Sequence, residues 1–311
     1  IMNNENQTIH KSNDNLTIYG WNEKLNQLKQ ESIYSTLAHG RVSIVHRTCY
    51  EVISGNGLFQ CELTGNMMYG KSDDELPCTG DWVIFQPFDE HKGIIVDSLP
   101  RERTLYRKKS GTVADKQVIA SYVDKAFIVQ SLDDNFNVRR VERFMVQIME
   151  ENISSVLVLN KADLDFDRQS VEEQIKHISS QIPVFFTSIH QLETIVRLRK
   201  SISEGETVVF VGSSGVGKSS LVNALCEKPV LLTSDISLST GKGRHTSTRR
   251  EMVLMDSSGV LIDTPGVREF GLAIDNPDSL AEVLEISDYA ESCRFKDCKH
   301  INEPGCAVLE A

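Results

Sequence analysis

The motif GSSGVGKS at residues 212–219 constrains the fold of this chain more than any other feature of its sequence. It matches G-x-x-x-x-G-K-[ST], follows the apolar run TVVFV and precedes SSLVNALC, which is compatible with a helix. A strand, a glycine-rich loop and a helix in this order are the structural context of a phosphate-binding loop. The sequence therefore predicts an α/β P-loop domain.

The residue types of this loop fit the chemistry of a nucleotide phosphate. Glycine lets successive backbone N–H groups point at phosphate oxygens, and the helix N-terminus adds positive potential. Lys218 is expected to neutralise the β- and γ-phosphates and assist catalysis, and the Ser219 hydroxyl to ligate Mg²⁺. The other residues predicted to bind the nucleotide here are Gly212, Ser213, Ser214, Gly215, Val216, Gly217 and Ser220.

A second motif, NKAD at 160–163, follows the apolar run SVLVL and matches the base-recognition motif N-K-x-D. The Asp163 carboxylate can accept two hydrogen bonds, from N1–H and N2–H₂ of guanine, whereas adenine presents no such donor pair. Asn160 and the stem of Lys161 are expected to brace this loop and flank the base. A guanine nucleotide is therefore favoured, and a P-loop kinase or ATPase is disfavoured.

A supporting loop is expected at FFTS, which ends at Ser188 and would close on the base through backbone N–H groups. The residues predicted to complete the base pocket are Leu164, Thr187 and Ser188.

The run LIDTPG (261–266) supplies the third element of the site. Asp263 is expected to hold Mg²⁺ through its water shell, and the Gly266 N–H to sense the γ-phosphate. Either Thr246 or Thr248 in the preceding GKGRHTSTRR would complete the magnesium shell, and the following arginine favours Thr248.

These parts stand in an unusual order, because an ordinary GTP-binding domain has its phosphate loop before its base-recognition motif. Here the order is base recognition, base support, phosphate loop, switch threonine and DTPG. Termini of a domain often lie close together, so one cut and one rejoining can give this order and keep the fold. The sequence predicts a circularly permuted domain.

Strand-like runs at 125–130, 155–159, 182–187 and 207–211 alternate with helical patterns at 138–152, 168–180 and 190–202. This alternation predicts a mostly parallel sheet covered on both faces.

Residues 37–100 have a different sequence pattern, with short β-like runs separated by SGNG and FDEHKG. A small barrel of the oligonucleotide-binding (OB) or SH3-like type fits this pattern. Trp82 is expected in its core, whereas Phe59 and Phe85 could be core residues or RNA contacts. Residues 16–36 could form a short helix.

The formal net charge of −11 argues at face value against a nucleic-acid partner. Two segments are nevertheless basic: 101–116, with six basic and two acidic side chains, and 239–250, with four basic side chains and no acidic one. Either a solvated loop or a local RNA contact would explain them.

The N-terminal residues 1–15 are polar, lack the apolar core of a secretory signal and are expected to be disordered. No apolar run approaches the roughly 20 residues of a membrane span. We expect a cytoplasmic protein, and nothing in the sequence demands more than a monomer. Seven cysteines without an export signal disfavour disulfides.

Four residues near the C-terminus have the spacing C-x₄-C-x-H-x₅-C. A Cys₃His set suits tetrahedral Zn²⁺, and four protein ligands leave no open position, so the site would be structural. The predicted ligands are Cys293, Cys298, His300 and Cys306.

From about residue 37 to 311 the sequence resembles the circularly permuted RsgA/YjeQ GTPase family. The shared motifs include GDWV, GSSGVGKSSL, GRHTST, DTPGVREFGL and the cysteine-rich C-terminus. The resemblance implies a GTPase that acts in late maturation of the small (30S) ribosomal subunit, contacts its rRNA and is stimulated by it. The implied regions are an N-terminal segment (1–36), an OB-fold barrel (37–100), a basic linker (101–116), a permuted G domain (117–275) and a zinc-binding domain (276–311).

Hydrolysis requires a residue that orients the attacking water. Val267 stands where Ras-type switches carry the glutamine that orients water, so intrinsic hydrolysis is expected to be slow. His245 matches the family's G-x-H-T histidine and is the candidate for orienting water, although it could instead contact RNA or pack. A GTP-dependent RNA-binding scaffold is the alternative. The chain ends five residues after Cys306, so the zinc-binding domain is interpreted as shortened.

Overall fold

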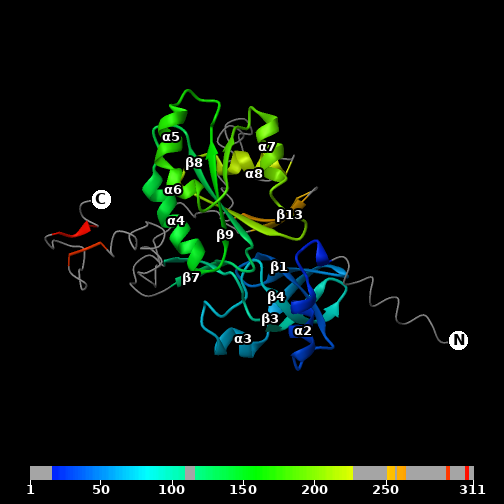
Figure 1. The fold of residues 1–311 in the computed structure, drawn as a ribbon. Coiled ribbons are helices and arrows are strands. Elements are labelled where there is room, and N and C mark those ends of the chain that lie inside the picture. The colour runs from blue at the N-terminus through cyan, green and yellow to red at the C-terminus, as the bar shows by residue number, and fades with distance from the viewer. Residues whose placement is uncertain are drawn as a thin grey trace.

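The computed structural model describes residues 16–108, 116–226, 251–255, 258–263, 292–294 and 305–307. Within this part of the chain, one sheet of 11 strands runs through a barrel and an α/β domain (Figure 1). Its strand order is β10-β9-β8-β11-β13-β12-β1-β2-β3-β5-β4, and a pairing of β1 with β4 closes the barrel.

The barrel consists of five strands and one short helix between its third and fourth strands. These are β1 (Ala38–Val45), β2 (Tyr50–Ser54), β3 (Gly57–Leu63), α3 (Gly65–Gly70), β4 (Trp82–Asp89) and β5 (Lys92–Ser98). The β3–β5 pair is parallel, and the other four pairs are antiparallel. A closed five-stranded barrel of this kind is OB-like.

Alternation of side chains along the strands fills the barrel. In β3, Phe59 and Cys61 are buried while Leu58, Gln60 and Glu62 face outward, as the period of two in a strand requires. Phe85 is fully buried, and its ring centroid lies 5.1 Å from that of Phe59. The prediction that Trp82 belongs to the core is confirmed, and both phenylalanines prove to be core residues as well.

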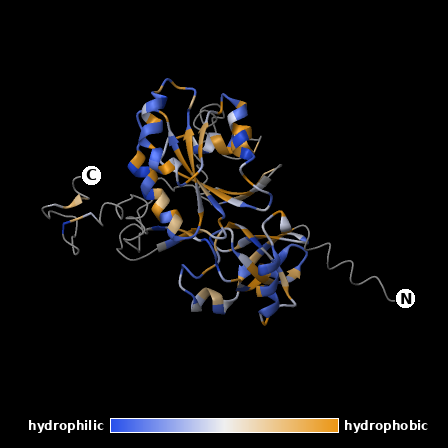
Figure 2. Ribbon diagram, in the orientation of Figure 1, coloured by the Kyte–Doolittle hydropathy of each residue, from blue (hydrophilic) through white to orange (hydrophobic). Residues whose placement is uncertain are grey.

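As far as it is described, the α/β domain has five parallel strands and one antiparallel strand, β12, at the side that meets the barrel. The strands are β8 (Lys125–Ser131), β9 (Ser154–Asn160), β10 (Val184–Thr187), β11 (Thr207–Val211), β12 (Glu251–Met255) and β13 (Ser258–Asp263). The four strands expected from apolar runs are confirmed. β8, β9 and β11 are buried along almost their whole length, and β10 at the edge of the sheet is half-buried. The strands appear hydrophobic between helices with hydrophilic outer sides (Figure 2).

Helices cover both faces of this sheet (Figure 1). On one face α4 (Val138–Glu150), α5 (Arg168–Gln174) and α6 (Lys176–Ser179) contribute to one core cluster. On the other, α7 (Leu192–Arg199) and α8 (Lys218–Leu225) contribute to a second.

Local boundaries differ from the sequence prediction in several places. The helix expected within 16–36 is α2 (Glu23–Glu31), which begins after Asn22, whose side chain accepts the backbone N–H of Leu25. The single helix expected at 168–180 is divided at Ile175. The predicted basic linker contains a strand, β6 (Leu105–Lys108), which pairs with β7 (Lys116–Ala120). Residues 109–115 lie outside the described part.

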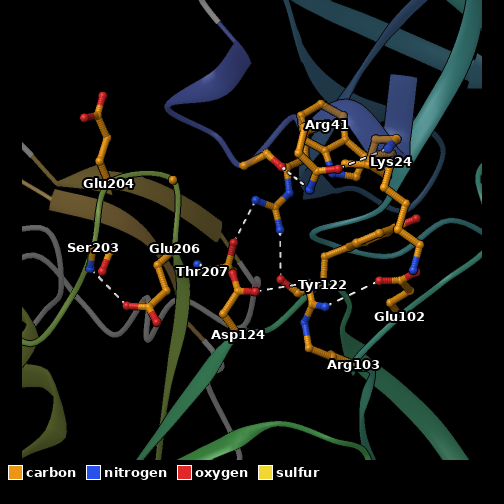
Figure 3. A pocket seen from close by; sticks show the side chains of 15 residues that line it. Lys24, Arg41, Glu102, Arg103, Tyr122, Asp124, Ser203, Glu204, Glu206 and Thr207 are labelled. Atoms are coloured by element: carbon orange, nitrogen blue, oxygen red, sulfur yellow. Dashed lines mark hydrogen bonds and ion pairs between the residues drawn. The ribbon is translucent and has the colours of Figure 1, made fainter. Parts of the chain in front are cut away.

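The barrel and the α/β domain are joined by a buried arginine (Figure 3). Arg41 of β1 is 1% exposed and donates from Nη1 to Thr207 Oγ1 of β11 over 2.8 Å. It also donates from Nε to the carbonyl of Gly80 (2.9 Å) and from Nη2 to that of Tyr122 (3.3 Å). Burial lowers the pKa of Arg41 to about 10. Hydrogen bonds to carbonyl and hydroxyl oxygens hold this cation in place.

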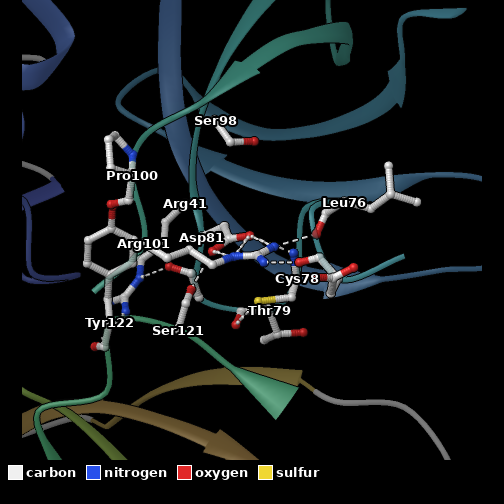
Figure 4. Close-up of polar contacts among 12 residues, drawn as sticks. Arg41, Leu76, Cys78, Thr79, Asp81, Ser98, Pro100, Arg101, Ser121 and Tyr122 are labelled. Atoms are coloured by element: carbon white, nitrogen blue, oxygen red, sulfur yellow. Dashed lines mark hydrogen bonds and ion pairs between the residues drawn. The ribbon is translucent and has the colours of Figure 1, made fainter. Parts of the chain in front are cut away.

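A buried carboxylate forms the second contact of this interface (Figure 4). Asp81 is fully buried and accepts hydrogen bonds from Arg101 Nη2 (2.8 Å), Ser121 Oγ (2.6 Å) and the backbone N–H of Cys78 (2.7 Å). Ser121 lies between β7 and β8, so Asp81 connects the barrel to the entry of the α/β domain. We refer to the Arg41 and Asp81 contacts together as the domain interface.

Among the described residues, no helix has both the length and the apolar character needed to cross a membrane.

Candidate nucleotide-binding site

The predicted site residues meet where the parallel strands end. Ser131, Asn160 and Thr187 are the last residues of β8, β9 and β10, and they are in register across the sheet. Loops that follow the carboxyl ends of parallel strands form the ligand-binding edge of an α/β sheet. We call this region, with the loops at 131–135, 160–164, 187–190 and 212–219, the nucleotide edge.

The phosphate loop has the backbone that its glycines predict. Gly212, Gly215 and Gly217 have φ angles of 146°, 81° and 94°, in the range that favours glycine. A Cβ at Gly212 would lie 2.3 Å from the carbonyl oxygen of Val129, so the loop must pass close to β8. Lys218, the first residue of α8, donates from Nζ to the carbonyls of Gly212 (2.7 Å) and Ser213 (2.6 Å).

Asn160 connects base recognition to the phosphate loop. Its Nδ2 donates to the carbonyl of Val216 over 2.9 Å, and its Oδ1 accepts from Thr187 Oγ1 over 3.3 Å. A Cβ at Gly217 would lie 2.3 Å from that Nδ2, so the contact requires glycine. The two motifs in reversed order are thus brought together by one buried amide.

Asp163 is held by the supporting loop. Ser188 Oγ donates to its Oδ1 over 2.5 Å, and the backbone N–H of His190 donates to the same Ser188 oxygen over 3.0 Å. The hydrogen bond from Ser188 lowers the pKa of Asp163, so the carboxylate is ionised and able to accept N–H groups at neutral pH. Ala162 N–H donates to the Thr187 carbonyl (3.0 Å), which fixes one loop on the other.

Asp133, a residue that the sequence analysis missed, belongs to the same edge. Its Oδ2 lies 2.7 Å from Lys161 Nζ, and its Oδ1 accepts from Ser131 Oγ (2.6 Å) and the Asn135 N–H (3.0 Å). A signal was available, because SLDD follows the strand expected at 125–130 as NKAD follows its own strand.

Comparison with known proteins agrees with this geometry. The profile of the family described as RsgA GTPase matches residues 98–273. A relative from Bacteroides thetaiotaomicron, named small ribosomal subunit biogenesis GTPase RsgA 1, is 76% identical over 97% of this chain and 85% of its own length. The chain belongs to the RsgA GTPase family. It is accordingly a GTP hydrolase, and the family implies Mg²⁺ with the nucleotide.

Another relative, small ribosomal subunit biogenesis GTPase RsgA from Methanosarcina acetivorans, is 39% identical over 100% of this chain and 85% of its own length. The crystal structure of YjeQ from Thermotoga maritima aligns with a TM-score of 0.64 and 26% identity, covering 88% of this chain and 90% of that one. YloQ, described as a circularly permuted GTPase, aligns with a TM-score of 0.62 over 90% and 89% of the two chains; at 21% identity it supports the fold alone.

The magnesium side of the RsgA-family site is described in part. β13 runs parallel to β11, with Val209 opposite Ile262, and ends at Asp263 beside the strand that leads into the phosphate loop. Ser219 and Ser220 lie in the first turn of α8. The other predicted residues lie outside the described residues: His245, Thr246, Thr248, Val267 and Gly266.

Two of the four predicted zinc ligands are described. Cys293 Sγ and Cys306 Sγ are 3.9 Å apart, and Arg294 N–H donates to the carbonyl of Gly305 over 3.1 Å. Thiolates at ~2.3 Å from one tetrahedral Zn²⁺ lie about 3.8 Å apart, so this pair has suitable geometry. Cys298 and His300 lie outside the described residues. Within the described residues, no group of three or more side chains that could hold a metal ion is found.

Proposed function

We propose that this RsgA-family chain binds the small ribosomal subunit and assists its late maturation, hydrolysing GTP to GDP and phosphate under stimulation by the subunit. Relatives that share 76% and 39% of its residues carry small-subunit biogenesis in their names. The observation that supports a guanine-specific switch is the ionised Asp163 carboxylate, fixed by Ser188 at the nucleotide edge.

The nucleotide would span the edge from base to phosphate. Asp163 would accept the guanine N1–H and N2–H₂, and the glycine-rich loop with the N-terminus of α8 would bind the phosphates. Lys218 would leave its carbonyl partners for the β- and γ-phosphates, while Ser219 and Asp263 would hold Mg²⁺. Neighbouring contacts would come from Leu164, Ser213, Ser214, Gly215 and Ser220. The fully buried Thr187 would act through its hydrogen bond to Asn160.

Hydrolysis would depend on the partner. Val267 cannot orient water, so we assign that role to His245, with Thr246 or Thr248 completing the magnesium shell and Gly266 sensing the γ-phosphate. A histidine in a switch segment would be ordered when the subunit binds, which would couple hydrolysis to assembly.

The C-terminal segment would hold one structural Zn²⁺ through Cys293, Cys298, His300 and Cys306. The 3.9 Å separation of the two described sulfur atoms supports this set. The zinc content of the purified chain is expected to be about one ion per chain and to fall on Cys306→Ser exchange. Absence of zinc from the unaltered, folded chain would contradict the assignment.

Contacts with rRNA would come from the basic segments 101–116 and 239–250, against an overall charge of −11. The burial of Phe59, Trp82 and Phe85 removes these aromatic residues from the candidate RNA contacts of the barrel. We further propose that the protein acts in the cytoplasm as a monomer, with the region boundaries given above.

The deciding experiment measures GTP hydrolysis with and without purified small ribosomal subunits. We expect a large stimulation that Lys218→Ala abolishes and His245→Ala reduces. GTP-dependent binding to the subunit without any stimulation would instead favour the scaffold function, to which Val267 points.

A further inference from the structure

The Lys161 side chain is held at the nucleotide edge by a residue outside every motif of the site. Asp133 follows the end of β8, and its Oδ2 lies 2.7 Å from Lys161 Nζ. We propose that Asp133 is a positioning residue for the guanine nucleotide, which orders the Lys161 side chain before the nucleotide binds. This proposal rests on the proposed base-recognition role of the 160–163 loop.

The Asp133 carboxylate is itself fixed on its second oxygen. Ser131 Oγ and the Asn135 N–H both donate to Oδ1, over 2.6 and 3.0 Å. Desolvation, the largest effect, raises the pKa of Asp133, but the hydrogen bonds from Lys161, Ser131 and Asn135 outweigh it and lower the pKa to about 2. Asp133 is therefore a rigid, permanently charged partner for the ammonium group.

The rest of the base-recognition loop is positioned by other contacts. Asn160 donates to the phosphate loop, Ala162 to the Thr187 carbonyl, and Asp163 accepts from Ser188. Lys161 stands in the middle of this loop with a φ angle of 62°, a left-handed conformation that is uncommon for a residue with a side chain. Asp133 thus constrains the one long side chain among these four residues.

The ion pair is placed to affect binding more than folding. The Lys161 and Asp133 side chains remain 35% and 23% exposed, and pairs of such exposure contribute little to stability. A lysine side chain loses considerable rotamer freedom when it is fixed beside a ligand. Because the pair already imposes that order, the nucleotide binds at a lower entropic cost.

The chain offers a matched control in the next residue. Asp134 has the same charge but is exposed. In Asp133→Asn the amide oxygen can still accept from Ser131 and Asn135, while the ionic partner of Lys161 is lost. Asp134→Asn removes the same net charge from the same loop and leaves the pair intact.

The experiment measures equilibrium dissociation constants of a fluorescent GDP, with GTP and IDP as competitors, for the full chain and its variants. Asp133→Asn is expected to weaken the binding of all three nucleotides about tenfold, because the ordering of Lys161 does not depend on the exocyclic amine of guanine. Asp134→Asn is expected to stay within about twofold of the unaltered chain. In hydrolysis assays the change should appear in KM and not in kcat.

A double-mutant cycle separates positioning from general distortion. In a Lys161→Met background, Asp133→Asn should have no further effect. The proposal is overturned if Asp133→Asn binds GDP as Asp134→Asn does, or if its effect persists without Lys161. Asp163→Asn serves as a separate check of the proposed function. If Asp163→Asn leaves the preference for guanine unchanged, the assignment of the base-recognition site is wrong. If Asp163→Asn changes that preference but Asp133→Asn leaves nucleotide affinity unchanged, only the positioning role of Asp133 is wrong.

Discussion

The domain interface and the nucleotide edge both contain charged side chains that join segments far apart in the sequence, but these side chains differ in burial. At the interface, Arg41 and Asp81 are 1% and 0% exposed and have several fixed partners. At the edge, the Lys161 and Asp133 side chains are 35% and 23% exposed. The interface therefore has its polar groups satisfied within the protein, whereas the edge keeps charged atoms accessible to a ligand.

This difference in burial predicts how the two regions respond to mutation. Removing one partner of a buried charged network leaves others unsatisfied, and this costs folding free energy. Removing an accessible charge costs little stability and changes what can bind. Variants at the interface should lower the free energy of unfolding, and variants at the edge should change nucleotide binding.

The largest loss of stability is expected for Asp81→Ala. It would leave Arg101, Ser121 and the Cys78 N–H without their buried acceptor, and breaking such a pair costs about 3–5 kcal/mol. Chemical denaturation checks this, with Asp89→Ala as the control, since Asp89 is 57% exposed. A loss as small as that of the control would show that the interface does not contribute to stability.

Arg41→Met is expected to reduce stability by about 3 kcal/mol, because it leaves buried oxygens without their donor. GDP affinity should be unchanged, since the Thr207 contact lies at the start of β11 and the phosphate loop follows its end. Arg47→Met, at an exposed position, is the control for denaturation. A weaker GDP affinity in folded Arg41→Met would mean that the two regions are coupled.

Gly217→Ala should weaken GDP binding by at least tenfold relative to Gly215→Ala. Both glycines have positive φ angles, but only at Gly217 would a Cβ meet Asn160 Nδ2, at 2.3 Å; at Gly215 nothing lies within 4 Å. The comparison thus isolates the Asn160 contact from backbone strain. Equal affinities for the two variants would contradict the role given to Asn160.

The last effect concerns pH and is confined to the barrel. Burial, followed by the charge of Lys29, lowers the pKa of His39 to about 4 from its ordinary 6.5. Between pH 6.5 and 4, His39 therefore binds a proton in the unfolded chain but not in the folded chain. Its contribution to the free energy of unfolding is fully present above pH 6.5 and is lost as the pH drops toward 4. The contribution of this one residue is at most about 1.4 kcal/mol per pH unit.

Denaturation at pH 7 and pH 5 checks this prediction. His39→Gln should show a shallower loss of stability over this interval than the unaltered chain. An identical slope in both proteins would assign the acid sensitivity to other groups.

The sequence predicted the parts of the molecule whose chemistry is local. GSSGVGKS and NKAD each specify a loop within a few residues, and apolar runs specified the strands that carry them. Asp133 was missed because its role depends on the register of β8 against β9, which sets Ser131 opposite Asn160. Arg41 was missed because a basic residue within RVSIV resembles an outward-facing strand residue until the second domain covers it.

The β6 strand was missed for a related reason. Its basic sequence favours a solvated linker, and only pairing with β7 makes it a strand. Tertiary contacts determine both the strand conformation of this segment and the burial of Phe59 and Phe85.

The most direct test of the account is the nucleotide preference of Asp163→Asn. The account predicts that GDP affinity falls by about 100-fold while XDP affinity rises, because an amide can donate to the second carbonyl of xanthine and no longer accepts both guanine donors. Denaturation should show stability within about 0.5 kcal/mol of the unaltered chain. Unchanged preference for GDP over XDP in a folded variant would contradict the assignment of the 160–163 loop to guanine recognition.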